Sequence, residues 1–365
     1  MNLFEEQRLV DVCSYLRSGK TITASEISTH GEYPVFGGNG CRGYTTHYNF
    51  SGDCAIIGRQ GAFCGNVRYF TGNAYMTEHA IIACANNKNN TRYLSYLLST
   101  MNLGRLSGQS AQPGLSVKYL SNVKIFIPSL NIQKKIVSVL SLLDDKIKLN
   151  NKINDNLQQQ AATLFANFYE QAETEVGFTE LVQILGGGTP KTGEKSYWNG
   201  KVLFFTPKDI GFPYTLSTEK TITEEGLAHC NSRLYPVNTV FVTARGTVGK
   251  IGMPGVPMAM NQSCYALIGK NTNQILVYFY TLKVVDRLKY KASGAVFDAI
   301  TTRDFETESI FKLSDAHAEA FLNIARPIYR AILGNTFENQ QLTALRDFLL
   351  PKLISGELDV SELAI

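Results

Sequence analysis

Several features are missing from this chain of 365 residues, and each absence excludes a class of protein. The seven cysteines are odd in number and form no C-x-x-C pair, which argues against a disulfide framework and a zinc ribbon. No apolar run approaches the roughly 18 residues that span a bilayer. The N-terminal MNLFEEQRLVDV lacks the basic start and apolar core of a secretory signal. We therefore expect a cytoplasmic protein without a membrane partner.

Motifs of catalysis and nucleotide binding are missing as well. In GGGTPKTGEKS, Glu194 stands between Gly193 and Lys195, whereas a P-loop needs adjacent glycine and lysine. The five histidines are scattered without metal-ligand spacing. No G-x-S-x-G string is found, nor the Asn/Asp-Pro-Pro-aromatic string of an adenine methyltransferase. We expect no metal or cofactor in this chain, and no catalysis unless a partner supplies it.

What the chain does contain is ordinary globular composition, with 44% apolar and 18% charged residues, at a length that allows two or more domains. The net charge of +4 is only mildly basic. It is compatible with a nucleic-acid partner without requiring one.

Residues 129–169 have the spacing of a coiled-coil seam, with steps of four and three between stripe residues, which predicts one long helix. Adding 185 to each position gives a second stripe near the C-terminus. The first stripe is Ile136, Leu140, Leu143, Ile147, Asn150, Asn154, Leu157, Ala161, Leu164 and Phe168, and the second is Phe321, Ala325, Ile328, Ile332, Asn335, Asn339, Leu342, Arg346, Leu349 and Leu353.

Both stripes place Asn at the same two positions, and a polar seam residue mainly serves to fix register. The pairs Asn150 with Asn154 and Asn335 with Asn339 therefore predict two helices built to lie against each other. Any two amphipathic helices could share such a stripe, but the flanks of these two agree as well. We expect Pro327 to kink the second helix or to begin it after a break, and Pro351 to help end it.

The repeat extends beyond the helices. Ser129 and Ser314 each stand where a helix N-cap is wanted. AIIGRQGAFCGNV, from Ala55, resembles FVTARGTVGKI, from Phe241: a strand, a turn with Arg and Gly, and a second strand. The string LVDV at position 9 matches LVQI at position 181, an offset of 172, so the second globule holds 13 more residues (185 − 172).

These patterns predict a mixed α/β (α+β) protein in which two globules alternate with two long helices, with approximate twofold symmetry inside one chain. The helices are expected to form an intramolecular antiparallel coiled coil. The expected boundaries are 1–128 for the first globule, 129–172 for the first helix, 173–313 for the second globule and 314–365 for the second helix.

Several strings together resemble one family. LGGGTPKTGEKSYWNGKVLFFTPKDI, from Leu185 to Ile210, is similar to the opening of a target-recognition domain in the specificity subunit of type I restriction-modification systems, where G-G-T-P, Y-W-x-G and T-P-x-D follow one another. GEYPVFGGNGCRGY, from Gly31, resembles another opening of this family. PSLNIQKKI, LNNKIN and the C-terminal ENQQLTALRDFLLPKLISGEL are similar to its spacer helices. The resemblance covers essentially the whole chain, twice over.

The resemblance implies a DNA-binding protein without chemistry of its own. Each target-recognition domain would read one half of an asymmetric bipartite site in double-stranded DNA. The helix pair would set the spacing, since two modules on one side of B-DNA lie roughly 34–36 Å apart. It would also dock two methyltransferase (M) subunits. Restriction-translocase (R) subunits would complete the assembly, and S-adenosylmethionine, ATP and Mg²⁺ would bind to these partners.

Candidate DNA contacts follow from chemistry: Arg, Lys, Asn and Gln read bases, and phosphates are held by Lys, Arg, Ser, Thr and backbone N–H groups. Arg59 and Arg245 stand in matching turns, so we expect them to anchor the DNA backbone while neighbours specify. The alternative for any single basic residue is a solvated side chain. The candidates are Asn39, Arg42, Tyr44, Arg59 and Gln60 in the first globule, and Thr189, Lys191, Thr192, Lys195, Tyr197, Lys208, Arg245 and Lys250 in the second.

Two other classes of function stay open at this point. A DNA-modifying enzyme, either an adenine methyltransferase or a nuclease with an unrecognised active site, would act on DNA without a partner. A coiled-coil adaptor with two protein-binding globules would share the helices but read no DNA. Methyl transfer by the pure chain would support the enzyme, whereas a co-purifying methyltransferase that modifies one bipartite site would exclude the adaptor.

Overall fold

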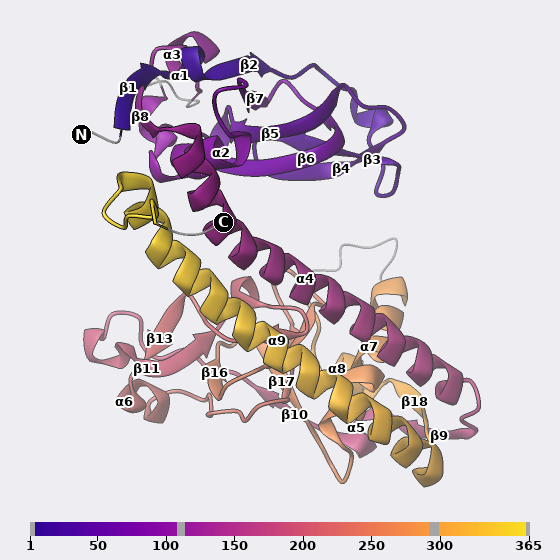
Figure 1. The fold of residues 1–365 in the computed structure, drawn as a ribbon. Helices are drawn as coiled ribbons and strands as arrows, with labels where there is room; N and C mark the ends of the chain where they lie inside the picture. The colour runs from indigo at the N-terminus through magenta and orange to yellow at the C-terminus, as the bar shows by residue number, and fades with distance from the viewer. Residues whose placement is uncertain (1–3, 108–113, 292–298, 363–365) are drawn as a thin grey trace. The chain divides into compact units, whose positions relative to one another are not determined.

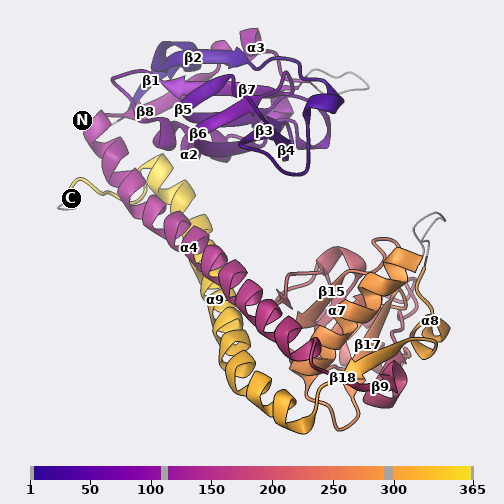
Figure 2. The same ribbon diagram turned by 90° about the vertical axis from the view of Figure 1, so that its right-hand side faces the viewer.

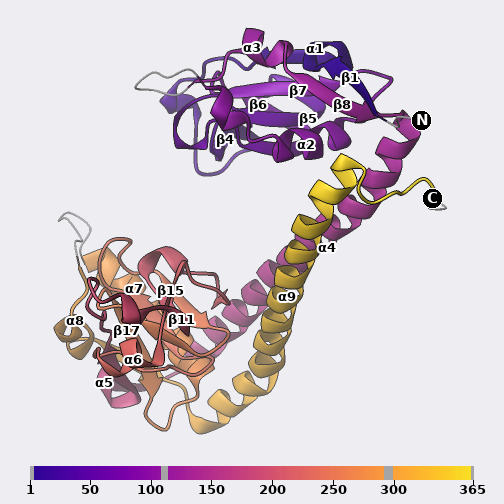
Figure 3. The same cartoon turned by 90° about the vertical axis from the view of Figure 1, so that its left-hand side faces the viewer.

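Two long helices, α4 (Leu130–Tyr169) and α9 (Asp315–Ser355), dominate the computed structural model of this chain (Figure 1). The structure describes residues 4–107, 114–291 and 299–362. The two helices lie side by side and run antiparallel, as predicted (Figures 2 and 3). Every one of the predicted stripe positions is buried or partly buried. The seam spacing therefore identified the buried face of both helices.

The structure confirms one predicted helix cap, excludes a break at Pro327 and corrects the prediction for Pro351. The Ser314 hydroxyl accepts a hydrogen bond from the His317 amide at 3.2 Å, as an N-cap residue does. Pro327 lies inside α9, so of the two alternatives predicted for it the break is wrong, and α9 is a single curved helix (Figure 2). One missing N–H is tolerated because a long helix packed on its partner keeps its other bonds. Pro351 does not end the helix either; Gly356, with φ +77°, follows its last residue.

The chain divides into two compact units, residues 1–146 with 342–365, and residues 147–341. Each unit contains its own sheets and the parts of α4 and α9 that pack with them. The apolar core of the first unit includes Ile136 of α4 and Leu353 of α9. The core of the second includes Phe165 of α4 and Phe321 of α9. The domain boundaries drawn from the sequence remain a prediction beside this division.

The first unit contains a six-stranded sheet in the order β2-β7-β5-β6-β3-β4, in which β3 and β6 run parallel and the other neighbours antiparallel. Its strands are β2 (Cys13–Ser18), β3 (Tyr33–Gly37), β4 (Gly40–Thr45), β5 (Phe50–Gly58), β6 (Val67–Met76) and β7 (Ala80–Ala85). A two-stranded sheet of β1 (Phe4–Arg8) and β8 (Lys124–Pro128), and the helices α1 (Leu9–Val12), α2 (Thr91–Thr100) and α3 (Val117–Ser121), complete it.

The second unit contains a five-stranded sheet in the order β10-β17-β14-β15-β12, a three-stranded sheet β13-β11-β16 and the pair β18-β9. The strands are β9 (Thr174–Gly177), β10 (Val182–Gly186), β11 (Trp198–Phe205), β12 (Tyr214–Thr215), β13 (Lys220–Ile222), β14 (Val240–Thr243), β15 (Ile251–Pro254), β16 (Met258–Met260), β17 (Cys264–Gly269) and β18 (Ser309–Lys312). The helices are α5 (Phe178–Leu181), α6 (Glu224–Ala228), α7 (Gln274–Lys291) and α8 (Thr302–Glu306). No helix in the described ranges is long and apolar enough to cross a membrane.

Matching backbone hydrogen bonds give the register of the repeat and correct one offset. The Leu9 amide donates to the Val123 carbonyl and the Phe178 amide to the Glu308 carbonyl, both at 2.8 Å. Leu9 therefore corresponds to Phe178, an offset of 169 rather than 172, and the second globule holds 16 more residues (185 − 169) rather than 13. The string match misled because LVQI begins at the last residue of α5, whereas LVDV is α1 itself.

The 16 extra residues lie in one segment. The Phe36 carbonyl accepts from the Thr77 amide, and the Phe205 carbonyl from the Asn261 amide, both at 2.9 Å, so the offset of 169 still holds at the ends of β3 and β11 (205 − 36). At the ends of β5 and β14 the offset is 185 (243 − 58), because the backbone hydrogen bonds of Gly58 and Thr243 close equivalent turns. Between these points β12, β13 and α6 stand in the second unit where the first has β4. The scaffold is thus repeated and this segment differs.

Candidate nucleic-acid interface

The repeated scaffold brings four loops together in each unit. In the first unit the Lys20 amide donates to the Met76 carbonyl and the Arg59 amide to the His79 carbonyl, both at 2.9 Å. In the second, Gly188 donates to Met260 at 3.1 Å and Ala244 to Ser263 at 2.8 Å. Together with the bonds to the Phe36 and Phe205 carbonyls, these contacts define a loop cluster in each unit. The first loop cluster consists of residues 19–21, 37–39, 59–66 and 77–79. The second loop cluster consists of residues 187–189, 206–208, 244–250 and 261–263.

The first loop cluster collects polar side chains from separate loops. The Gln60 side-chain oxygen lies 3.0 Å from His79 Nδ1, and the Arg59 guanidinium donates to the Glu78 carbonyl at 3.2 Å. The β3–β4 tip packs on them, because a Cβ on Gly38 would lie 3.2 Å from the His79 carbonyl oxygen. Asn39 follows Gly38 directly. The structure therefore gathers the predicted residues Asn39, Arg59 and Gln60.

Two other candidates of the first unit lie on β4. The Arg42 side chain packs against Gly37 at the tip, where a Cβ would lie 2.8 Å from its Cδ. Tyr44 is farther along the strand, where it pairs with Ser28, and its ring is 38% exposed. Arg42 thus borders the loop cluster, and Tyr44 stands apart from it.

The second loop cluster is built in the same way. Thr189 donates from its hydroxyl to the side-chain oxygen of Gln262, and the Arg245 amide donates to the Ser263 carbonyl at 3.3 Å. Lys208 lies on the loop after β11, and Lys250 closes the β14–β15 turn through its amide, which donates to the Thr243 hydroxyl at 2.9 Å. Four predicted residues, Thr189, Lys208, Arg245 and Lys250, therefore share this cluster.

The remaining candidates of the second unit gather elsewhere, in the loop that leads into β11. The Trp198 indole donates to the Lys191 carbonyl at 3.2 Å, and the Tyr197 ring stacks on His229 beside α6 with centroids 5.0 Å apart. Lys191, Thr192 and Lys195 are all exposed. This group precedes the segment in which the two units differ, and Tyr197 contacts that segment through His229.

The predicted basic residues have no acidic partner among the residues that the structure describes. Within the described ranges, no carboxylate lies within ion-pair distance of any of them, and the basic residues that do form ion pairs, such as Arg92, Arg287 and Arg346, lie elsewhere. Six of the seven are exposed and Arg59 is partly buried. Unpaired exposed cations are what a phosphate backbone needs. The seven are Arg42, Arg59, Lys191, Lys195, Lys208, Arg245 and Lys250.

One part of the predicted match between the units is wrong by a residue. The Leu115 amide donates to the Arg59 carbonyl at 2.8 Å, and the Ile300 amide to the Ala244 carbonyl at 3.0 Å. Gln60 then bridges to Gly114 as Arg245 bridges to Ala299. Arg59 therefore corresponds to the buried Ala244, and Arg245 corresponds to Gln60. The sequence comparison matched Arg with Arg because the residues are identical. The backbone hydrogen bonds, which define the equivalent positions, match Arg245 with Gln60 instead.

Comparison with known proteins agrees with this architecture. A family model described as type I restriction modification DNA specificity domain matches residues 1–159 and 174–311. The chain belongs to this specificity family. The predicted resemblance is thereby confirmed, and the two matched ranges correspond to the two copies of the repeat.

Individual relatives share parts of the chain. Over 133 residues it is 41% identical to the EcoprrI specificity subunit of Escherichia coli, a match covering 35% of this chain and 33% of that subunit. Over 327 residues it is 22% identical to the HindI specificity subunit of Haemophilus influenzae, covering 67% and 71%. The S subunit of a type I restriction-modification system from M. genitalium has the same fold, with a TM-score of 0.63, 15% identity and 96% of each chain covered.

Two cysteines of this specificity protein carry thiols that are at least partly buried. Burial raises the pKa of Cys13 and of Cys264 to about 12, so both thiols stay protonated at neutral pH and are not thiolate nucleophiles. Among the described residues, no group of three His, Cys, Asp or Glu side chains could hold a metal ion.

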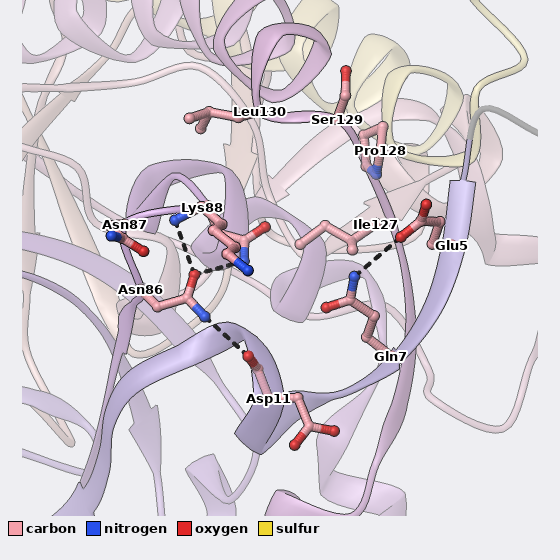
Figure 4. Close-up of a pocket in the computed structure, with 11 residues that line it drawn as sticks. Glu5, Gln7, Asp11, Asn86, Asn87, Lys88, Ile127, Pro128, Ser129 and Leu130 are labelled. Carbon is pink, nitrogen blue, oxygen red and sulfur yellow. Dashed lines mark hydrogen bonds between the residues drawn. The ribbon is translucent and has the colours of Figure 1, made fainter.

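A separate cavity lies within the first unit, beside the start of α4 (Figure 4). Its volume is about 430 Å³, and Asn86, whose side chain donates to the Asp11 carbonyl at 2.9 Å, lines it with Glu5 and Ser129. A cavity of about 550 Å³ lies at the equivalent place in the second unit, beside Glu180 and Asp315. No predicted DNA contact lines either cavity. Both are features of the repeated scaffold.

Sequence reasoning missed His79, Arg68, Gln262 and Ser263. Arg68 reaches the β3–β4 tip, where a Cβ on Gly40 would lie 2.3 Å from its guanidinium. His79 and Gln262 sit in the loops that contact Gln60 and Thr189. A signal was present, since YMTEHAII and AMNQSCYAL are the corresponding segments of the repeat. Nothing in those strings showed that they border the Arg-containing turns.

Proposed function

We propose that this chain is the DNA-binding specificity subunit of a type I restriction-modification complex. Each unit reads one half of a bipartite site in double-stranded DNA through its loop cluster. The two clusters carry different side chains on one scaffold, so the half-sites differ in sequence and the target is asymmetric. The α4–α9 pair sets the spacing between the half-sites.

The chemistry belongs to other subunits in this proposal. Two methyltransferase subunits, one for each copy of the repeat, dock on the chain and bind S-adenosylmethionine. Restriction-translocase subunits bind ATP and Mg²⁺. The chain itself has no catalytic role, holds no cofactor and works in the cytoplasm.

The proposed DNA contacts are those that the loop clusters gather. Arg59, Lys208 and Lys250 are suited to phosphates, and Asn39, Gln60, Thr189 and Arg245 carry groups that can read bases or hold phosphates. Arg42 borders the first cluster. Tyr44, Lys191, Thr192, Lys195 and Tyr197 are proposed as flanking contacts outside the clusters.

Beside the family match, one observation carries this proposal: basic side chains that have no ion-pair partner in the described part of the chain lie on equivalent loops of both units. An adaptor without DNA would have no need to leave these charges unpaired in both copies. Each exposed cation that neutralises a phosphate releases a counterion, so DNA affinity should depend steeply on salt.

Selection from a pool of randomised duplex DNA tests the proposal. The full chain, purified from the cells that make it with the subunits that accompany it, should enrich one bipartite sequence with a fixed spacer. Lys208→Gln should lower affinity for all sequences alike and reduce the slope of log K against log salt by about one. Arg330→Gln, an exposed arginine on α9, is the matched control and should change neither.

Enrichment of no sequence by the wild-type chain would contradict the proposal. Methyl transfer from S-adenosylmethionine to DNA by the chain alone would favour the enzyme instead. Enrichment of a single uninterrupted site would contradict the division of labour between the two units.

A further inference from the structure

The corrected register places one exposed side chain at the same point of both loop clusters. Gln60 follows Arg59, whose carbonyl accepts a hydrogen bond from the Leu115 amide at 2.8 Å. Arg245 follows Ala244, whose carbonyl accepts one from the Ile300 amide at 3.0 Å. The two backbones are therefore held alike, while the side chains differ in kind. Residues at this point vary on a fixed frame, which is the arrangement that a reader of differing half-sites requires.

The neighbouring residues direct these two side chains outward. Ala244 is buried, with 3% of its surface exposed, and Arg59 is partly buried with its guanidinium donating to the Glu78 carbonyl at 3.2 Å. Gly61 and Gly246 come next, with φ +75° and +81°, and a Cβ on either would meet nothing within 4 Å. In each turn, the residue that follows the exposed side chain is therefore a glycine, which has no side chain of its own.

The chemical types of the Gln60 and Arg245 side chains favour base reading over phosphate binding. Gln60 is neutral, so it adds no charge attraction to a phosphate, whereas both Gln60 and Arg245 can form two hydrogen bonds to the edge of a base. Arginine pairs with the O6 and N7 acceptors of guanine through two donors, and glutamine pairs with the N6 donor and N7 acceptor of adenine. Both are bidentate readers in the major groove, so one role accounts for both residues.

His79 prepares Gln60 for this role. Its Nδ1 lies 3.0 Å from the Gln60 side-chain oxygen, and with a proton on that nitrogen it donates to the amide and fixes which end is oxygen. The oxygen keeps a second lone pair for the adenine amino group, and the amide nitrogen is left to donate to N7. Arg245 needs no such orientation because its guanidinium donors form a rigid fork.

We propose that Gln60 and Arg245 are equivalent base-reading residues of the two units, Gln60 selecting adenine in one half-site and Arg245 selecting guanine in the other. His79 is a positioning residue for Gln60. This inference rests on the proposed function and adds to it the specificity-determining position of each unit.

Selection from randomised duplex DNA with substituted chains tests it. Arg245→Gln should replace a preferred guanine by adenine at one position of one half-site and leave the other half-site and the spacer unchanged. Gln60→Arg should do the reverse in the other half-site. Against the original sequence, each variant should lose roughly 5- to 150-fold in affinity, the discrimination expected of one bidentate pair.

Three further variants separate the alternatives. Arg245→Lys keeps the charge but replaces the rigid fork by a single ammonium group, so it should weaken the guanine preference and keep the salt dependence. His79→Ala should weaken the adenine preference without touching the other half-site. Arg330→Gln should leave the enriched sequence unchanged. Unchanged melting temperatures show that each chain has folded.

Two results would overturn the inference while the proposed function stands. One is an unchanged consensus with uniformly lower affinity for Arg245→Gln, which would make Arg245 a phosphate contact. The other is an adenine preference retained by Gln60→Arg. If the wild-type chain enriches no sequence at all, the proposed function itself fails.

Discussion

At the scale of single residues, two glycines of one turn show how the loop cluster keeps its shape. Gly61 and Gly65 both have left-handed backbones, with φ +75° and +85°. A Cβ on Gly61 would meet nothing, whereas on Gly65 it would lie 2.1 Å from the Gly104 amide nitrogen. Gly61 therefore needs only its conformational freedom, and Gly65 needs that freedom and the space.

These geometries predict unequal effects of alanine. Gly61→Ala should cost about 1–2 kcal/mol of unfolding free energy, the strain of a left-handed side chain. Gly65→Ala should cost roughly 1–3 kcal/mol more, because the Leu103–Gly104 backbone must also move. Urea unfolding of both variants measures the difference. Equal losses would mean that the approach of Gly104 is not constraining.

At the scale of elements, the α4–α9 pair depends on apolar and amide contacts along one seam. In the second unit the Asn335 amide donates to the Asn154 side-chain oxygen at 2.8 Å, and Asn150 donates to Asn339 at 2.9 Å. In the first unit the seam residue Arg346 donates to Asp144 at 3.0 Å, and Tyr96 donates to the same carboxylate at 2.5 Å. The four seam asparagines thus pair with each other, although their role in register remains a prediction.

A double-mutant cycle on Asn154 and Asn335 tests that role. Asn335→Leu alone should cost about 1–3 kcal/mol, because the Asn154 side chain, 7% exposed, is left without its partner. Replacing both by Leu should recover this loss or exceed it, since apolar seams are more stable and less specific.

Thermal unfolding of the two single variants and the double variant measures the coupling. Asn156→Ala, at an exposed position of the same helix, is the control and should stay within about 0.5 kcal/mol. A double-Leu chain that enriches several spacer lengths would support the register role. One that enriches only the original spacer would contradict it.

At the scale of the whole molecule, the division into two units offers a test of the proposed ruler. The unit boundaries fall between Lys146 and Ile147 in α4 and between Gln341 and Leu342 in α9. Seven residues inserted at both points add about 10.5 Å of helix. At about 3.4 Å per base pair, the enriched site should gain about three base pairs of spacer.

Both half-sites should keep their sequences, because each unit keeps its own contacts. Affinity should fall, since three base pairs also rotate one half-site by about 100° around the DNA axis. DNA selection with the lengthened chain measures spacer and half-sites together. An insertion in α4 alone should instead break the pairing and lower the melting temperature. Altered half-sites with an unchanged spacer would contradict the ruler.

The sequence by itself determined the long helices, their antiparallel pairing and the repeat. Steps of four and three over ten positions are satisfied only by a helix, and a helix needs contacts no farther than four residues away. The strand-turn-strand segments at Ala55 and Phe241 were predictable for a similar reason, because alternation and glycine turns are local. The basic candidates of both turns followed from these strings.

The tertiary structure alone decided which residues correspond and which meet. Gln60 is equivalent to Arg245, and Leu9 to Phe178, because their hydrogen-bond partners, near Leu115 and Ile300 or Val123 and Glu308, lie far away along the chain. The meeting of His79 with Gln60, and of Gln262 with Thr189, has the same origin. Local spacing specifies an element, but only pairing between distant segments sets the register in which side chains share a surface.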